Sequence, residues 1–175
     1  MIKNARIFSN PFYIDCLRMA LTSKNDKRQD QAFGAVLVNQ GQIIGRGVNR
    51  AISHPRFKLE RIIKQGWVNH AEVEALNDAL VKQKNVEGGL IYVAGLFLAL
   101  KLLFFQSEYT CVKCISPLRK YGIRGIMIPT PNGWIEKSID EAETDARGCQ
   151  WPREHYRKRI GIAMGEYSLD SAIKE

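Results

Sequence analysis

Two short motifs contain side chains suited to metal-assisted chemistry. An H-x-E triplet places an imidazole at His70 and a carboxylate at Glu72, and a C-x-x-C pair places thiols at Cys111 and Cys114. A C-x-x-C pair alone suits a redox dithiol or half of a structural zinc site. A structural site needs four protein ligands, and the sequence has no second C-x-x-C and no H-x-x-x-H. His70, Cys111 and Cys114 therefore predict a catalytic zinc with three protein ligands and one position for water.

Glu72 is the candidate proton carrier beside this metal. It follows His70 by two residues in the first turn of a predicted helix, close enough to reach the water without binding the ion. Zinc lowers the pKa of its bound water to about 7, and a nearby carboxylate can accept the proton and pass it on. A first-turn acid also has a structural use, because it complements the helix dipole by about 0.3–1 kcal/mol.

The motifs are predicted to lie at the starts of helices in a mixed α/β domain. Asn69 is the predicted N-cap of the helix that begins at His70, and Gly122 is predicted to close the helix that begins at Cys111. The predicted order is helix 11–24, a strand hairpin over 33–49 with its turn at 39–41, helix 70–83, strand 88–94, helix 111–122, strand 123–129 and helix 134–147. Strands that alternate with helices indicate helices packed on a central sheet.

These pieces resemble the cytidine/deoxycytidylate deaminase superfamily over roughly residues 12–148. The matching segments, in family order, are FGAVLV (33–38), IIGRGVN (43–49), NHAEVEAL (69–76), LIYVA (90–94) and CVKC (111–114). An H-x-E triplet followed by a C-x-x-C pair is typical of zinc-dependent base deaminases, in which the glutamate is the general acid and base. The resemblance implies a three-layer α/β/α cytidine deaminase-like fold, with a mixed central sheet and helices on both faces.

Two branches of the superfamily share features with the chain. GAVLV, GRGVNR, ISH and HAEVEAL look like tRNA adenosine deaminases, whereas KNDKRQD, the ending PTPNGWIEKSIDEAETDARG and the long spacer between Asn49 and His70 look like phage and bacterial dCMP deaminases. The spacer favours the second branch, because the tRNA branch keeps it short. The resemblance then implies a hydrolase acting on C–N bonds of cyclic amidines. It would convert dCMP to dUMP, with zinc-activated water as nucleophile and Glu72 as proton shuttle.

Three residues are candidates for binding the substrate. Asn49 occupies a position from which the family's asparagine reaches the bound nucleoside, and an asparagine after a strand also serves ordinary turns. Tyr109 is a candidate for stacking on a base because it lies two residues before Cys111. Ala71, between His70 and Glu72, completes the predicted set.

Three departures from the family pattern stand out. Thr110 replaces the proline before the first cysteine, a change expected to alter backbone rigidity more than metal chemistry. Arg50 follows Asn49 where dCMP deaminases tend to have glycine. About a dozen extra residues precede Cys111 and form an apolar insertion near 95–108. The insertion suits a cover over the site, an oligomer interface or a degenerate enzyme.

Length and charge complete the expectations. The 175 residues suit one zinc-dependent deaminase domain, 1–175, with a basic C-terminal tail at 151–175. The net charge of +8 favours an anionic partner, either a nucleotide or a nucleic acid. No leader or membrane span is evident, so we expect a cytoplasmic protein without a membrane partner. The resemblance implies a homo-oligomer.

Two alternative functions stay open. The first is a base deaminase acting on tRNA or single-stranded nucleic acid, in which the positive charge would follow a phosphate backbone. The second is a non-catalytic, zinc-stabilised interaction protein that assembles through the apolar run 95–105.

Overall fold

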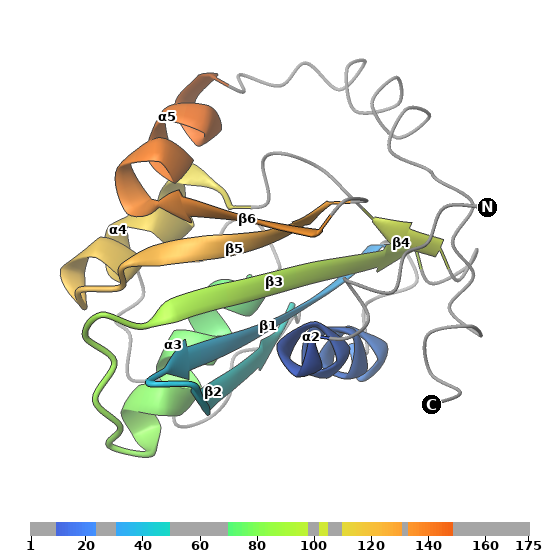
Figure 1. Cartoon of the computed structure of the whole chain (residues 1–175), viewed down its shortest axis with the longest axis horizontal. Coiled ribbons are helices and arrows are strands. Elements are labelled where there is room, and N and C mark those ends of the chain that lie inside the picture. The colour runs from blue at the N-terminus through green and yellow to red at the C-terminus, as the bar shows by residue number, and fades with distance from the viewer. Residues whose placement is uncertain are drawn as a thin grey trace.

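A computed structural model describes residues 10–23, 31–49, 70–97, 102–104, 110–130 and 133–148 of the chain (Figure 1). Its helices are α2 (Pro11–Leu21), α3 (Ala71–Val81), α4 (Val112–Lys120) and α5 (Ile139–Gly148). Its strands are β1 (Gln31–Asn39), β2 (Gln42–Val48), β3 (Leu90–Phe97), β4 (Leu102–Phe104), β5 (Gly125–Thr130) and β6 (Gly133–Ser138). The basic tail and residues 57–66, for which the sequence suggests helical content, lie outside the described residues.

The strands form one mixed sheet in the order β2-β1-β3-β5-β6, with β4 paired to β3. Neighbouring strands run antiparallel except β3 and β5, which are parallel in the register Leu90↔Gly125. The predicted β1–β2 hairpin is confirmed: its turn places Gln40 at φ 49° and Gly41 at φ 73°, the left-handed conformation that a two-residue hairpin turn requires. The parallel pair needs a crossover, and α4 lies within the segment that provides it.

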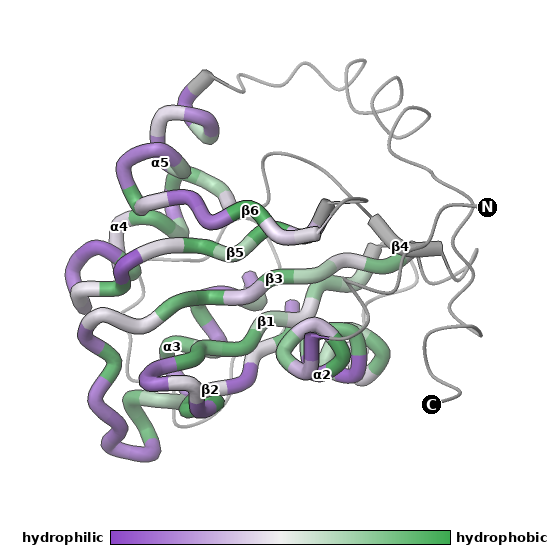
Figure 2. The backbone as a smooth tube through the Cα atoms, in the orientation of Figure 1, coloured by the Kyte–Doolittle hydropathy of each residue, from purple (hydrophilic) through white to green (hydrophobic). Residues whose placement is uncertain are grey.

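Alternate residues of the strands fill two separate cores. In β1, Ala35 and Leu37 belong to a core that also contains residues of α3, α4 and α5, whereas Val36 and Val38 belong to a core that contains residues of α2. Figure 2 shows the resulting mixture of hydrophobic and hydrophilic residues along the strands. Helices therefore cover both faces of the sheet, and the predicted three-layer α/β/α arrangement is confirmed.

Small residues bring the helices close to the sheet. A Cβ atom on Gly34 would lie 1.9 Å from the carbonyl oxygen of Cys16 in α2, and one on Gly45 would lie 2.2 Å from the carbonyl oxygen of Ala75 in α3. Since real atoms do not approach so closely, only glycine permits these two helix positions.

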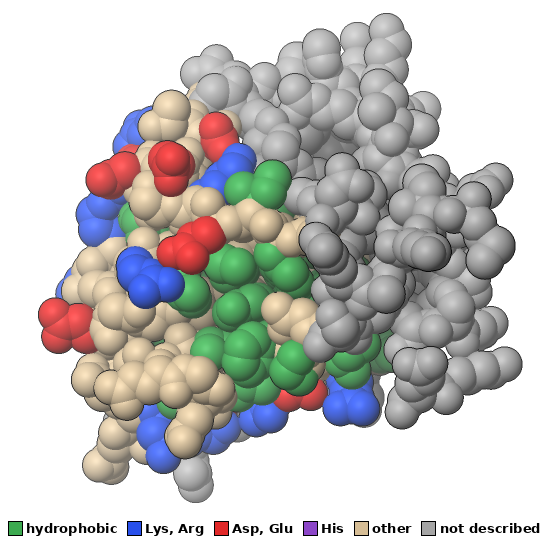
Figure 3. Space-filling view, viewed as in Figure 1, with side chains coloured by type: hydrophobic (Ala, Val, Ile, Leu, Met, Phe, Trp, Pro, Cys, Tyr) green, Lys and Arg blue, Asp and Glu red, His purple; other side chains and the backbone are tan. Residues whose placement is uncertain are grey.

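On the face that carries α2, apolar side chains gather over the middle of the sheet with charged groups around them (Figure 3). The partly buried members are Phe12, Ile43, Leu90, Met127 and Trp134. Among the described elements, only α2 packs against this face. No helix in the described part of the chain is long and apolar enough to cross a membrane.

The sequence prediction of one helix over 134–147 is wrong for its first five residues. Residues 133–138 form the edge strand β6, which pairs antiparallel with β5 from Gly125↔Ser138 to Thr130↔Gly133. Helix α5 begins only after Ser138, whose hydroxyl accepts from Glu141 N at 3.2 Å while Glu141 Oε2 accepts from Ser138 N at 2.8 Å. This reciprocal capping box fixes the start of the helix.

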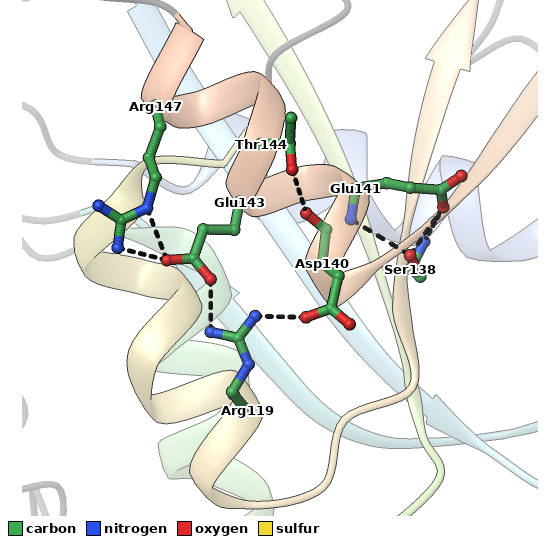
Figure 4. A network of polar contacts seen from close by, with 7 residues as sticks. All are labelled: Arg119, Ser138, Asp140, Glu141, Glu143, Thr144 and Arg147. Carbon is green, nitrogen blue, oxygen red and sulfur yellow. Dashed lines mark hydrogen bonds and ion pairs between the residues drawn. The ribbon is translucent and has the colours of Figure 1, made fainter.

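Helix α5 is tied to α4 by ion pairs (Figure 4). Arg119 of α4 contacts Asp140 and Glu143 of α5, both at 2.6 Å, and Arg147 also binds Glu143 at 2.5 Å. Arg119, Asp140 and Arg147 are solvent-exposed and Glu143 is half-buried, so each pair adds little stability. Their effect is to hold α5 beside the helix that carries Cys114.

Part of the predicted insertion forms sheet. Strand β3 continues to Phe97, three residues beyond the predicted end of the strand at 94, and β4 pairs antiparallel with this extension. The register joins Gly95 to Phe104 and Phe97 to Leu102. This arrangement does not distinguish between a cover over the site, an oligomer interface and a degenerate enzyme. All three roles of the insertion stay predictions.

Candidate metal centre

The imidazole and the two thiols of the predicted ligand set meet at one point. Nδ1 of His70 lies 3.4 Å from Cys111 Sγ and 3.2 Å from Cys114 Sγ, and the two sulfurs are 3.0 Å apart. All three atoms lie within 4.8 Å of one another. A tetrahedral zinc spaces such ligand atoms by roughly 3.5–3.8 Å. Side-chain rotations that move these atoms apart by up to about 0.8 Å would therefore admit one zinc ion, and the residues fit the metal.

Two helix N-termini position these ligands. His70 is the N-cap residue of α3 and Cys111 that of α4, and neither side chain makes a capping hydrogen bond within the described residues. Both side chains are therefore available to a metal. Cys114 completes the first turn of α4, where its N–H donates to the carbonyl of Cys111 at 2.9 Å. The positive end of the α4 dipole favours thiolates at this place. The N-cap predicted at Asn69 is instead His70, and Asn69 lies outside the described residues.

Hydrogen bonds and burial set the protonation states of the three ligands before a metal binds. Hydrogen bonding from Cys114, together with the neighbouring His70, lowers the pKa of Cys111 to about 4, so Cys111 is a thiolate at neutral pH. Burial is the largest single effect on His70 and lowers its pKa, but the hydrogen bond with Cys111 and the charges of Glu72 and Cys111 together outweigh burial and raise the His70 pKa to about 9. Burial raises the pKa of Cys114 well above its ordinary value. Cys111 is thus a thiolate before a metal arrives, and zinc must displace protons from both Cys114 and His70.

Glu72 lies beside the ligands in the first turn of α3. Its side chain is buried, with 3% of the residue exposed. Among the described residues, Glu72 Oε1 has no hydrogen-bond partner of full geometry. Burial is the main cause that raises its pKa to about 7, and the charge of His70 opposes the shift. An acid that only complements a helix dipole gains nothing from such burial, whereas a buried carboxyl oxygen without a protein partner suits a small polar ligand.

The three predicted substrate contacts differ in what the structure describes. Asn49 follows β2 and is buried, and its Oδ1 accepts from the Phe33 N–H at 2.7 Å, which fixes the orientation of the amide. Ala71 is the first residue of α3 and is 1% exposed. Tyr109 lies outside the described residues. The substrate-binding roles of all three stay predictions.

Sequence reasoning overlooked the hydroxyl of Thr110. Thr110 is buried immediately before Cys111, and its Oγ1 has no partner of full hydrogen-bond geometry among the described residues. As a replacement for proline, Thr110 predicts only a change in backbone rigidity. The available signal was its chemistry: a hydroxyl next to a metal-binding thiol is a potential donor, which proline is not.

Comparisons with known proteins agree with this geometry. Residues 11–130 match the family described as the cytidine and deoxycytidylate deaminase zinc-binding region. The cytidine deaminase from Burkholderia pseudomallei shares the fold, with a TM-score of 0.53 at 17% identity over 75% of this chain and 92% of that one. The apo dCMP deaminase from cyanophage S-TIM5 aligns with a TM-score of 0.45 at 19% identity over 66% of this chain and 76% of that one. Among curated proteins, no sequence matches the chain significantly.

Proposed function

The chain belongs to the family with the cytidine and deoxycytidylate deaminase zinc-binding region, and from this premise we propose that it deaminates a free cytosine nucleotide, dCMP to dUMP. Membership and the intact His-Cys-Cys set make the protein a zinc-dependent deaminase. The observation that carries the reaction is the position of Glu72, a buried carboxyl with one unpartnered oxygen among the described residues, in the same helical turn as His70.

His70, Cys111 and Cys114 would hold the zinc, which when bound would lower the pKa of a water at the site to about 7. Glu72 would accept a proton from the attacking water as the water oxygen bonds to C4 of the cytosine ring, and would pass that proton to the ring nitrogen. Glu72 then carries the second proton of the water to the exocyclic amino group. The C4–N bond breaks, ammonia leaves and a carbonyl remains at C4. Water and cytosine are thus converted to uracil and ammonia.

Substrate positioning is assigned to residues at the edges of the metal centre. Asn49 would hold the sugar through its oriented amide, and Ala71 would contact the base at the start of α3, where backbone N–H groups lack partners within the helix. Tyr109 would stack on the base. The net charge of +8 supports an anionic substrate with at least one phosphate.

The choice of a free nucleotide rests on the long spacer between Asn49 and His70 and on the ending at 129–148. Ammonia release from dCMP, CMP, cytidine, guanine and a tRNA anticodon stem-loop, each incubated with the zinc-loaded protein, tests it. Release from dCMP, with at least about a tenfold preference over cytidine, supports the proposal, because a phosphate contact adds a charge-assisted hydrogen bond. Release from the stem-loop alone would assign the activity to nucleic acid. If no compound releases ammonia, the result would favour the alternative of a non-catalytic, zinc-stabilised interaction protein.

A further inference from the structure

Two buried side chains beside the metal ligands each have an oxygen without a hydrogen-bond partner of full geometry among the described residues, and the two are chemically complementary. Thr110 Oγ1 is one, and Glu72 Oε1 is the other. A hydroxyl donates a hydrogen bond and a carboxylate accepts one, so each can satisfy the other. Since buried polar groups are nearly always paired, two such groups in one site indicate a contact that small rotations complete.

The fold places these residues next to each other although they are far apart in sequence. Thr110 immediately precedes Cys111, and Glu72 follows His70 by two residues. Cys111 Sγ and His70 Nδ1 are 3.4 Å apart, and helices α3 and α4 pack against each other. The Thr110 hydroxyl lies near enough to the Glu72 carboxyl to lower the pKa of that carboxyl, against the larger effect of burial. No backbone movement is therefore needed to bring the two groups together.

We propose that Thr110 is a positioning residue, whose hydroxyl donates a hydrogen bond to the Glu72 carboxylate and keeps it directed at the metal ligands. The catalytic part of this inference rests on the proposed function, because Glu72 needs a fixed orientation only if it carries protons. A carboxylate held by one neutral donor still has lone pairs for the reacting water. The hydroxyl thus orients Glu72 without blocking it.

The kinetic test compares Thr110→Val, which removes the hydroxyl but keeps the shape, with Thr110→Ser, which keeps the hydroxyl. With the zinc-loaded protein and dCMP, Thr110→Val is expected to lower kcat about tenfold with KM changed less than about twofold, because the lost contact acts on proton transfer. Thr110→Ser is expected to stay within about threefold of the parent. Equal losses in both variants, or a full kcat in Thr110→Val, would overturn the proposal.

A second test needs no turnover. The thermal midpoint of the zinc-loaded protein is measured for Thr110→Val, Glu72→Ala and the double variant. The contact predicts that Thr110→Val lowers the midpoint in the parent but does not lower it when Glu72 is already alanine. Equal shifts in both backgrounds would show that the two side chains do not interact, and would overturn the proposal whether or not dCMP is a substrate.

Matched controls separate these results from general effects. Thr144→Val removes an exposed hydroxyl on α5, which donates to the Asp140 carbonyl at 2.9 Å, and is expected to leave kcat unchanged. Zinc content is measured in every variant, and Thr110→Val is expected to retain the zinc of the parent. A parent that turns over none of the panel compounds contradicts the proposed function, and the thermal comparison then decides the contact alone.

Discussion

A Cβ atom on Gly47 would lie 2.0 Å from the carbonyl oxygen of Ala71. Strand β2 therefore packs directly against the first turn of α3, between His70 and Glu72. The same atom would lie 2.3 Å from the backbone nitrogen of Ala75, so backbone surrounds Gly47 on this side. Because Gly47 has no side chain, the first turn of α3 can lie this close to β2. This close approach sets the positions of His70 and Glu72.

Gly47→Ala is expected to displace the first turn of α3. Backbone atoms cannot rotate away as a flexible side chain can, so we expect a loss of about 3 kcal/mol in the free energy of unfolding, together with reduced zinc content. Urea denaturation and metal analysis measure the two effects. Gly41→Asn is the control, because its site has no atom within 4 Å and its φ of 73° is one that asparagine tolerates. A Gly47→Ala protein as stable and as zinc-rich as the parent would contradict this account of the packing.

Cys114→Ser is expected to abolish tight zinc binding, because the alcohol replaces one of three protein ligands by a far weaker one. Cys16→Ser is the matched control: Cys16 is also fully buried, but its Sγ contacts the Tyr92 carbonyl at 3.3 Å and lies on the α2 side of the sheet. Metal analysis after dialysis should find one zinc per chain in the parent and in Cys16→Ser, and almost none in Cys114→Ser. Zinc retained in Cys114→Ser would exclude this cysteine as a ligand.

In protein stripped of metal by a chelator, Cys111 should be alkylated before Cys16 and Cys114, the two other cysteines that the structure describes. A depressed pKa of about 4 means that Cys111 stays a thiolate at pH 6 and loses this advantage only as the pH falls towards 4. Burial raises the pKa of Cys16 and of Cys114, so both remain thiols at pH 6. Iodoacetamide treatment and peptide mapping by mass spectrometry measure the order, and added zinc should protect Cys111. Faster labelling of Cys16 than of Cys111 would be incompatible with these charges.

Ser138→Ala is expected to lower the free energy of unfolding by about 1 kcal/mol, because it removes the hydroxyl side of the capping box with Glu141. Zinc content should not change, since α5 carries none of the ligands. Ser116→Ala, at an exposed position inside α4, serves as the control and should be neutral or slightly stabilising. Equal effects of the two substitutions would mean that the capping box contributes nothing measurable.

The sequence predicted the metal ligands well because their residue types are rare in combination. His70, Cys111 and Cys114 are chemically distinctive, and regular hydrophobic periodicity predicted the helices that carry them. The hairpin turn at Gln40 and Gly41 was equally clear, because few residues adopt positive φ. These signals are local in sequence and do not depend on distant partners.

The errors arose where a distant partner decides the structure. Residues 134–138 alternate in a way that fits a helix or an edge strand, and only pairing with β5 selects the strand. The capping box of Ser138 and Glu141 was a local signal that would have moved the helix start to the right place. The burial of Thr110 and Glu72 could not be predicted, because it results from packing between α3 and α4.

Ammonia release from dCMP by the parent and by Glu72→Gln, both zinc-loaded, tests the central claim most directly. The amide keeps the size of the side chain but cannot accept and return a proton, so the account predicts an active parent and a loss of about a thousandfold in kcat with zinc content unchanged. Glu72→Gln with the activity of the parent would contradict the role of Glu72. A parent that releases no ammonia from dCMP would contradict the proposed substrate.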